Sequence, residues 1–327
     1  MKRRTFILAG GLAALDCRTA RAQARHARIG MLSARPLAQS PYASGVKNRL
    51  HELGYLRQRG AGLEFRSADG DVTRYPKLAS ELVDAKCDLI LAIGPAQTAL
   101  ALRDAGSRAP MVFLAVDYDP VEKGIVSSLR STGGNVTGAY VPQVELAVKR
   151  MQLMLEITPR ARRLLTFVDL YCRDQASAVR EAATASGVQL TAIEFSKSPY
   201  DYISAFDSGR KQAAQAYVGL ASPVFASDAA ALAPLLVKYR LPGAGTTVSQ
   251  AEAGFLLSYS VDVAKVSRRA ADIADRVLKG AKPAQIPVEQ ADEFELAINA
   301  RTAQMLDVKV PESILARATK IISSTPP

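Results

Sequence analysis

The sequence predicts an α/β protein of two doubly wound, Rossmann-like lobes joined by a hinge. The 327 residues, 48% apolar and 22% charged, suffice for two domains with separate cores. From Arg28 onward, short apolar runs alternate with amphipathic stretches, and this pattern restarts after a glycine-rich stretch at 133–138. Repeated β-α units of this length imply a parallel sheet in each lobe, because each crossover needs a helix that packs on the sheet.

The first lobe is predicted from four strand-like runs with helical patterns between them. We expect strands at 28–33, 62–67, 88–93 and 111–116, helices at 43–54, 74–86 and 96–106, and a short helix over 120–129. Asp119 directly precedes Pro120, and it would cap that short helix. The lobe is therefore predicted to comprise 28–141, with 262–285 returning to it.

The second lobe repeats the same pattern after the glycine-rich joint. A helix at 144–157 precedes strands near 163–169, 188–195, 215–221 and 255–260, and helices are expected around 174–186, 200–213 and 226–239. A helix at 263–279, a strand at 294–298 and a final helix near 311–321 complete the chain. We assign 142–261 and 286–327 to this lobe, and we expect a ligand cleft between the two lobes.

The N-terminus has the three parts of an export signal. A basic start is followed by a short apolar run and an Ala-x-Ala site ending at Ala22, so residues 1–22 are predicted to be a signal peptide. The paired Arg3 and Arg4 are also typical of a twin-arginine signal. Cys17 lacks the small residue expected before a lipidated cysteine, so we do not expect a lipid anchor. These features predict a periplasmic protein.

The charge and the cysteines exclude other classes of protein. The predicted leader carries five Lys and Arg against one Asp, so its removal lowers the net charge from +11 to +7. The remaining basic residues are scattered among acidic ones, which argues against nucleic-acid binding. Cys87 and Cys172 lie far apart, and Cys87 precedes an apolar strand, so we interpret it as a buried side chain and not as half of a disulfide.

The sequence offers little material for catalysis. Its two histidines are His26, beside the predicted cleavage site, and His51, within a helical stretch. No phosphate-binding loop, nucleophile elbow, zinc-protease motif or closely spaced cysteine pair is present, so we expect neither a metal nor a cofactor. Asp117 and Asp119 form the closest carboxylate pair beside a strand end, and they leave an enzyme as a minor alternative.

Polar residues that directly follow strands are the predicted ligand contacts, because open α/β sheets bind ligands at the carboxyl ends of their strands. The turn at Gly94 opens a helix whose free amides suit an anionic group, although it could serve only as a turn. Tyrosine rings could stack on a solute. The predicted ligand-binding residues are Ser33, Gly94, Gln97, Thr98, Tyr118, Tyr171, Ser222 and Thr246.

A set of ordered sequence blocks extends over essentially the whole chain after the leader. It includes Leu50-His51-Glu52-Leu53-Gly54-Tyr55, Asp119-Pro120-Val121, Gly133-Gly134-Asn135-Val136-Thr137-Gly138, Glu252-Ala253-Gly254-Phe255 and Phe294-Glu295-Leu296-Ala297-Ile298-Asn299. Single blocks are weak signals. In this order they resemble the ABC transporter substrate-binding protein family, which includes tryptophan- and tyrosine-binding lipoproteins.

The resemblance implies a type I periplasmic-binding-protein fold whose lobes close over a small-molecule ligand. The solute would be an amino acid or an organic or aromatic carboxylate, delivered to an ABC permease and its ATPase subunits without chemical change. We expect a monomer. The chain departs from the family pattern at Gly94, which runs directly into proline, at Tyr118, which replaces glycine, and at 170–172, which replaces Asn-Pro. The identity of the ligand, an aromatic amino acid in some relatives, therefore cannot be carried over to this chain by position.

Two other binding proteins would share parts of this sequence pattern. An exported ligand sensor that signals through a receptor is the chief alternative, because it would use the same residues. A sugar-responsive repressor has a similar clamp, but a signal peptide stands where its DNA-binding helices would be.

Overall fold

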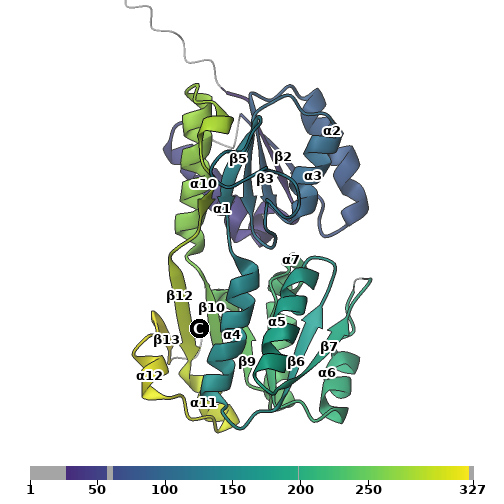
Figure 1. The fold of residues 1–327 in the computed structure, drawn as a ribbon, viewed down its shortest axis with the longest axis vertical. Helices are drawn as coiled ribbons and strands as arrows, with labels where there is room; N and C mark the ends of the chain where they lie inside the picture. Colours follow the sequence, from purple (N-terminus) through teal and green to yellow (C-terminus); the bar gives the residue numbers. More distant parts are fainter. Residues whose placement is uncertain (1–26, 57–61, 198, 324–327) are drawn as a thin grey trace, which may run out of the picture.

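The computed structural model describes residues 27–56, 62–197 and 199–323, which form two α/β lobes stacked along the long axis of the molecule (Figure 1). The predicted signal peptide and Cys17 lie outside these residues. The predicted fold class of two lobes with mostly parallel sheets is confirmed.

Lobe 1 is built on a six-stranded parallel sheet with the order β11-β5-β4-β3-β1-β2. Its strands are β1 (Ile29–Ser33), β2 (Leu63–Ser67), β3 (Leu89–Gly94), β4 (Met111–Ala115), β5 (Val136–Tyr140) and β11 (Glu289–Gln290). Its helices are α1 (Pro41–Glu52), α2 (Tyr75–Asp84), α3 (Ala96–Asp104) and α10 (Val263–Leu278).

Helices cover both faces of this sheet because successive strand side chains point to opposite sides. In β3, Leu91 packs into a buried cluster with residues of α1 and α10. Its neighbours Ile90 and Ala92 pack into a second cluster with residues of α2 and α3. The continuous apolar runs seen in the sequence are therefore central strands buried on both faces.

Lobe 2 contains a seven-stranded sheet with the order β13-β12-β10-β9-β8-β6-β7, in which only the β10–β12 pair is antiparallel. The strands are β6 (Arg163–Val168), β7 (Gln189–Glu194), β8 (Ala216–Val218), β9 (Gly243–Gly245), β10 (Leu257–Val261), β12 (Phe294–Asn299) and β13 (Lys320–Ile322). The helices are α4 (Gln143–Ile157), α5 (Arg173–Ala185), α6 (Tyr202–Lys211), α7 (Pro223–Ser227), α8 (Ala229–Lys238), α9 (Val248–Ala253), α11 (Ala300–Leu306) and α12 (Glu312–Leu315).

Within the described residues the chain passes between the lobes three times: after β5, between β10 and α10, and between β11 and β12. The last passage comes later than the predicted return at residue 286. Glu289 and Gln290 pair in parallel with Ala139 and Tyr140 of β5, so this segment belongs to the sheet of lobe 1. A two-residue strand has no periodicity, which is why the sequence pattern placed the boundary too early.

Strand β9 and helices α9 and α11 were not predicted from the sequence, and three predicted features take another form. The glycine-rich stretch continues into strand β5 and is more than a joint. Residues 120–129 form turns and not a helix, although Asp119 Oδ1 accepts hydrogen bonds from the amides of Val121 (2.7 Å) and Glu122 (3.1 Å), as a cap would. The predicted last helix is shorter, because α12 ends at Leu315 and the chain then forms β13.

Candidate functional site

A cleft of about 950 Å³ lies between the lobes and is lined by residues of both. Ser33, Gly94 and Asp117 come from the ends of β1, β3 and β4 in lobe 1. Ser222 and Thr246 follow β8 and β9 in lobe 2. The carboxyl ends of the two sheets therefore face the same cavity, which is the position expected for a ligand in open α/β sheets.

The cleft wall of lobe 1 carries charged groups without partners. Asp117 is 5% exposed, and its Oδ1 atom accepts no hydrogen bond from the described residues. Burial raises the pKa of this carboxyl well above its usual value, and the charge of Asp169 in lobe 2 raises it further. The buried Nε atom of Arg35, which also lines the cleft, is likewise unpaired among these residues. Buried groups of this kind are costly unless a ligand or water satisfies them.

Behind the cleft wall of lobe 2, buried polar groups bind one another and hold the lining residue Ser222. Ser222 Oγ donates to Asp169 Oδ2 at 2.5 Å, and the Tyr200 hydroxyl donates to the same oxygen at 3.3 Å. Asp169 Oδ1 accepts from the amide of Tyr171 at 2.9 Å. Burial raises the pKa of Asp169, and these hydrogen bonds oppose that rise. Ser222 is therefore held in place, whereas Ser260 Oγ, which lines the cleft from β10, has no hydrogen-bond partner among the described residues.

Half of the ligand-binding residues that were predicted from their position after a strand do meet in the cleft. Ser33, Gly94, Ser222 and Thr246 line the cleft. Gly94 has a φ of 113°, a conformation that side-chain-bearing residues rarely adopt, so it lets the chain turn there. The amide of Thr246 donates to Gln250 Oε1 at 2.6 Å, which fixes the loop after β9.

The other four predicted residues are not among those that line the cleft. The Thr98 hydroxyl is buried and donates to the carbonyl of Pro95 at 2.8 Å, so it closes the first turn of α3. Gln97 lies in the same turn. Tyr118 packs in the core cluster beneath α2 and α3. Tyr171 is buried beside the cleft, and burial together with the charge of Asp169 raises its pKa to about 12.

Several residues that line the cleft were not predicted, because the prediction considered only residues that directly follow a strand. Tyr42 stands in the first turn of α1, Gln143 in the first turn of α4, and Ser260 within β10. Asp117 follows β4, but the sequence suggested a catalytic pair with Asp119 instead. The first turn of α4 follows a crossover between the lobes, and that position is the signal that could have identified Gln143.

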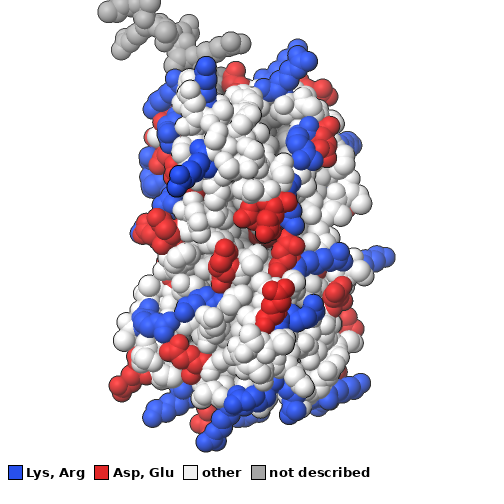
Figure 2. Space-filling model, in the orientation of Figure 1, with Lys and Arg blue, Asp and Glu red and all other residues white. Residues whose placement is uncertain are grey.

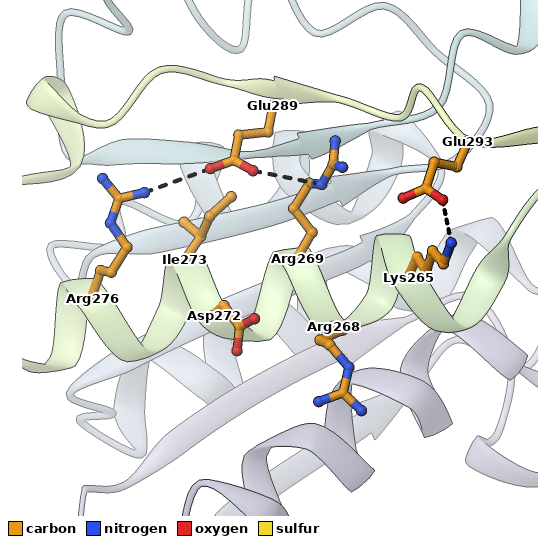
Figure 3. Close-up of a pocket in the computed structure, with 8 residues that line it drawn as sticks. All are labelled: Lys265, Arg268, Arg269, Asp272, Ile273, Arg276, Glu289 and Glu293. Carbon is orange, nitrogen blue, oxygen red and sulfur yellow. Dashed lines mark hydrogen bonds and ion pairs between the residues drawn. The ribbon is translucent and has the colours of Figure 1, made fainter.

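A second, smaller hollow of about 340 Å³ lies along the outer side of α10 (Figure 3). Most of its charged side chains pair with one another, whereas Arg268 and Asp272 pair with Glu52 and Arg49 of α1. Glu289 contacts Arg269 at 3.6 Å and Arg276 at 3.5 Å, and Lys265 pairs with Glu293. These contacts tie α10 to the segment that passes from β11 to β12, so the hollow belongs to the joint between the lobes.

The described residues contain no cluster of three or more His, Cys, Asp or Glu suited to a metal ion. Cys87 and Cys172 are both buried and unpaired. Within the same part of the chain, no helix is long and apolar enough to cross a bilayer.

Comparison with known proteins decides the family of the chain. The model of the family described as "ABC transporter substrate binding protein" matches residues 38–322. The chain belongs to the ABC transporter substrate-binding protein family. The members of this family are solute-binding proteins, and the resemblance inferred from the sequence blocks is confirmed.

The relatives of this substrate-binding protein include amino-acid binders. A curated tyrosine-binding protein of Clostridioides difficile is 26% identical over 276 residues, which cover 81% of this chain and 76% of the relative. A conserved domain protein of Vibrio cholerae has a TM-score of 0.81 at 25% identity, covering 91% of this chain and all of that one. An ABC domain of Streptococcus pneumoniae in complex with L-Trp has a TM-score of 0.78 at 23% identity, covering 90% and 100%. These likenesses establish the type I periplasmic-binding-protein fold.

Proposed function

We propose that this substrate-binding protein captures an amino acid, or a related organic or aromatic carboxylate, between its lobes and delivers it to an ABC importer. The supporting observation is the cleft of about 950 Å³, whose lobe 1 wall holds the unpartnered, buried carboxyl of Asp117. A solute ammonium would give this carboxyl a charge-assisted hydrogen bond. No bond in the solute is broken, and the role requires no cofactor.

The charge around the cleft supports a solute that carries a positive group. Four acidic residues line the cleft, Asp117, Asp228, Asp262 and Glu295, and the lining includes one arginine, Arg35. Figure 2 shows acidic side chains gathered at the waist between the lobes, whereas basic side chains predominate at the lower end. This negative cleft occurs in a chain with a net charge of +11, so it would attract a cationic group locally.

The proposed location is the periplasm, where the protein would meet its solute and the membrane permease. Contacts with both lobes would favour the closed arrangement, since a ligand shifts a conformational equilibrium by its differential affinity for the two states. An ion pair already joins the lobes: Lys123 Nζ lies 2.5 Å from Asp174 Oδ2.

A thermal-shift screen of the purified protein tests the proposal. The panel comprises amino acids, organic acids, aromatic acids, sugars and nucleosides. A solute at about 1,000 times its Kd adds roughly 4 kcal/mol to the free energy of unfolding, which raises the melting temperature by several degrees. Recovery of an unaltered amino acid or carboxylate supports the proposal. A shift only with sugars or nucleosides, or consumption of the solute, contradicts it.

A further inference from the structure

Arg150, in the middle of α4, is a fully buried cation without an acidic partner among the described residues. It is 0% exposed. Its guanidinium donates to Gln143 Oε1 at 3.3 and 3.2 Å, to the carbonyl of Tyr259 at 3.3 Å and to Gln175 Oε1 at 3.5 Å. Buried charges are normally paired with an opposite charge. This arrangement leaves a positive charge beneath the cleft that no carboxylate of these residues neutralises.

Arg150 fixes the direction of the Gln143 side-chain amide. A guanidinium only donates hydrogen bonds, so the atom of Gln143 that faces it must be the oxygen. The Nε2 group of Gln143 makes no hydrogen bond within the described part of the chain, and Gln143 lines the cleft. The amide therefore offers two N–H donors toward the cleft, with a positive charge behind them.

The neighbouring glutamine of Arg150 does not have this freedom. Gln175 Nε2 donates to the carbonyl of Ala221 at 3.0 Å, and its Oε1 accepts from the amide of Ala221 at 2.8 Å. Both ends of that amide are thus held by backbone groups. Gln143 is the member of the pair that is available to a solute.

Gln143, Asp117 and Tyr42 all line the same cleft. Tyr42, which lines the cleft, feels charges of both signs: burial raises the pKa of its hydroxyl, the charge of Arg150 lowers it, and the charge of Asp117 raises it. A group of each sign is therefore within electrostatic range of this one ring. The pair suits a small solute that carries opposite charges.

We propose that Gln143 binds a carboxylate of the solute through its side-chain amide, and that Arg150 is the positioning residue that orients this amide and supplies the opposing charge. This inference rests on the proposed function and specifies how the acidic group of the solute is recognised. Arg150 itself does not touch the solute, because it is fully buried.

The test compares Gln143→Glu with Gln152→Glu by calorimetric titration. Gln152 lies exposed on the same helix, so it makes a matched control. The probes are L-tyrosine with tyramine and L-tryptophan with tryptamine, pairs that differ only in the carboxylate. In Gln143→Glu the donor is lost and Arg150 is neutralised, so we expect the preference for the carboxylated member to fall at least 30-fold. Gln152→Glu is expected to keep the wild-type preference within threefold.

The melting temperature of the solute-free variants gives a second, independent measurement. The introduced carboxylate would supply the missing partner of Arg150, so we expect Gln143→Glu to melt no lower than the wild-type protein. A preference unchanged from the wild type, or a melting temperature lowered by more than about 5 °C, would overturn the assignment. If neither amino acid binds the wild-type protein, the solute is not tyrosine or tryptophan, and the melting temperatures still decide the Arg150–Gln143 arrangement; the thermal-shift screen decides the proposed solute class separately.

Discussion

Two buried carboxyl groups near the cleft, Asp117 in lobe 1 and Asp169 in lobe 2, differ in how their hydrogen-bonding capacity is satisfied. In lobe 1, Asp117 Oδ1 and Arg35 Nε have no partner among the described residues. In lobe 2, Asp169 accepts hydrogen bonds from Ser222, Tyr200 and the amide of Tyr171. Asp117 and Arg35 therefore depend on a solute or water for their missing bonds, whereas Asp169 is satisfied without one, although Ser260 Oγ in lobe 2 also has no partner among the described residues. This difference teaches that substitution of Asp117 should act mainly on affinity, whereas substitution of Ser222, which holds Asp169, should act mainly on stability.

The largest effect is expected from Asp117→Asn. The substitution keeps the shape of the side chain but removes the charge that would bind a solute ammonium. We expect the Kd of the solute found in the thermal-shift screen to rise about 100-fold, which corresponds to about 2.7 kcal/mol. Asp104→Asn, at an exposed carboxyl of α3, serves as the control. An unchanged Kd in calorimetric titration would remove Asp117 from the site.

Ser222→Ala tests the opposite wall. Ser222 Oγ also accepts from the amide of Val224 at 3.1 Å and so caps α7. Loss of this cap and of the bond to Asp169 should lower the free energy of unfolding by about 1 to 2 kcal/mol, measured by urea denaturation. The loss in affinity should be smaller than that of Asp117→Asn. The comparison is contradicted if Ser222→Ala weakens solute binding more than Asp117→Asn does.

A pH dependence follows from the raised pKa of Asp117. At a pH between the ordinary carboxyl pKa and the raised one, the folded, solute-free protein holds a proton on Asp117 that the unfolded chain releases, so the free energy of unfolding falls as the pH rises through this interval. Asp117→Asn lacks this proton. Its melting temperature relative to wild type should therefore increase with pH, and the difference should close at low pH. A difference that is constant with pH contradicts this prediction.

The smallest effect is expected at the ion pair between the lobes. Lys123 and Asp174 are partly exposed, with side-chain exposures of 34% and 43%, so their contact is screened by solvent. Lys123→Met should weaken solute binding about two- to fivefold, mainly through faster dissociation in stopped-flow measurements. Lys77→Met, at another exposed position of lobe 1, should leave the rate unchanged. At high salt the ion pair is screened, so the solute should dissociate from the wild-type protein as fast as it does from Lys123→Met.

Long periodic elements were predictable from the sequence, and short ones were not. The first four strands of lobe 1 and the helix α10 are buried on one or two faces, and this burial requires the apolar periodicity that is visible in the sequence. Strands β9 and β11, of three and two residues, are set by pairing with neighbours distant in the sequence. Local pattern contains no information about such partners.

The location of the cleft could be predicted from the sequence, but the identity of the side chains that line it could be predicted only in part. Ser33, Gly94, Ser222 and Thr246 line the cleft because the ends of parallel strands lie at one edge of a sheet. Tyr118 follows a strand as well, but its ring turns into the core of lobe 1. Which way a loop side chain points depends on packing, and packing is not visible in a single strand-end pattern.

The packing of α10 has a consequence for folding during synthesis. The chain emerges from the ribosome N-terminus first. The face of the first sheet that bears Leu91 and Leu114 is covered by α10, from Val263 onward, after most of lobe 2 has already emerged. The lobe that begins the sequence therefore completes its core late. Until α10 is made, α1 packs on this face, and the apolar surface that α10 later covers stays exposed on the nascent chain.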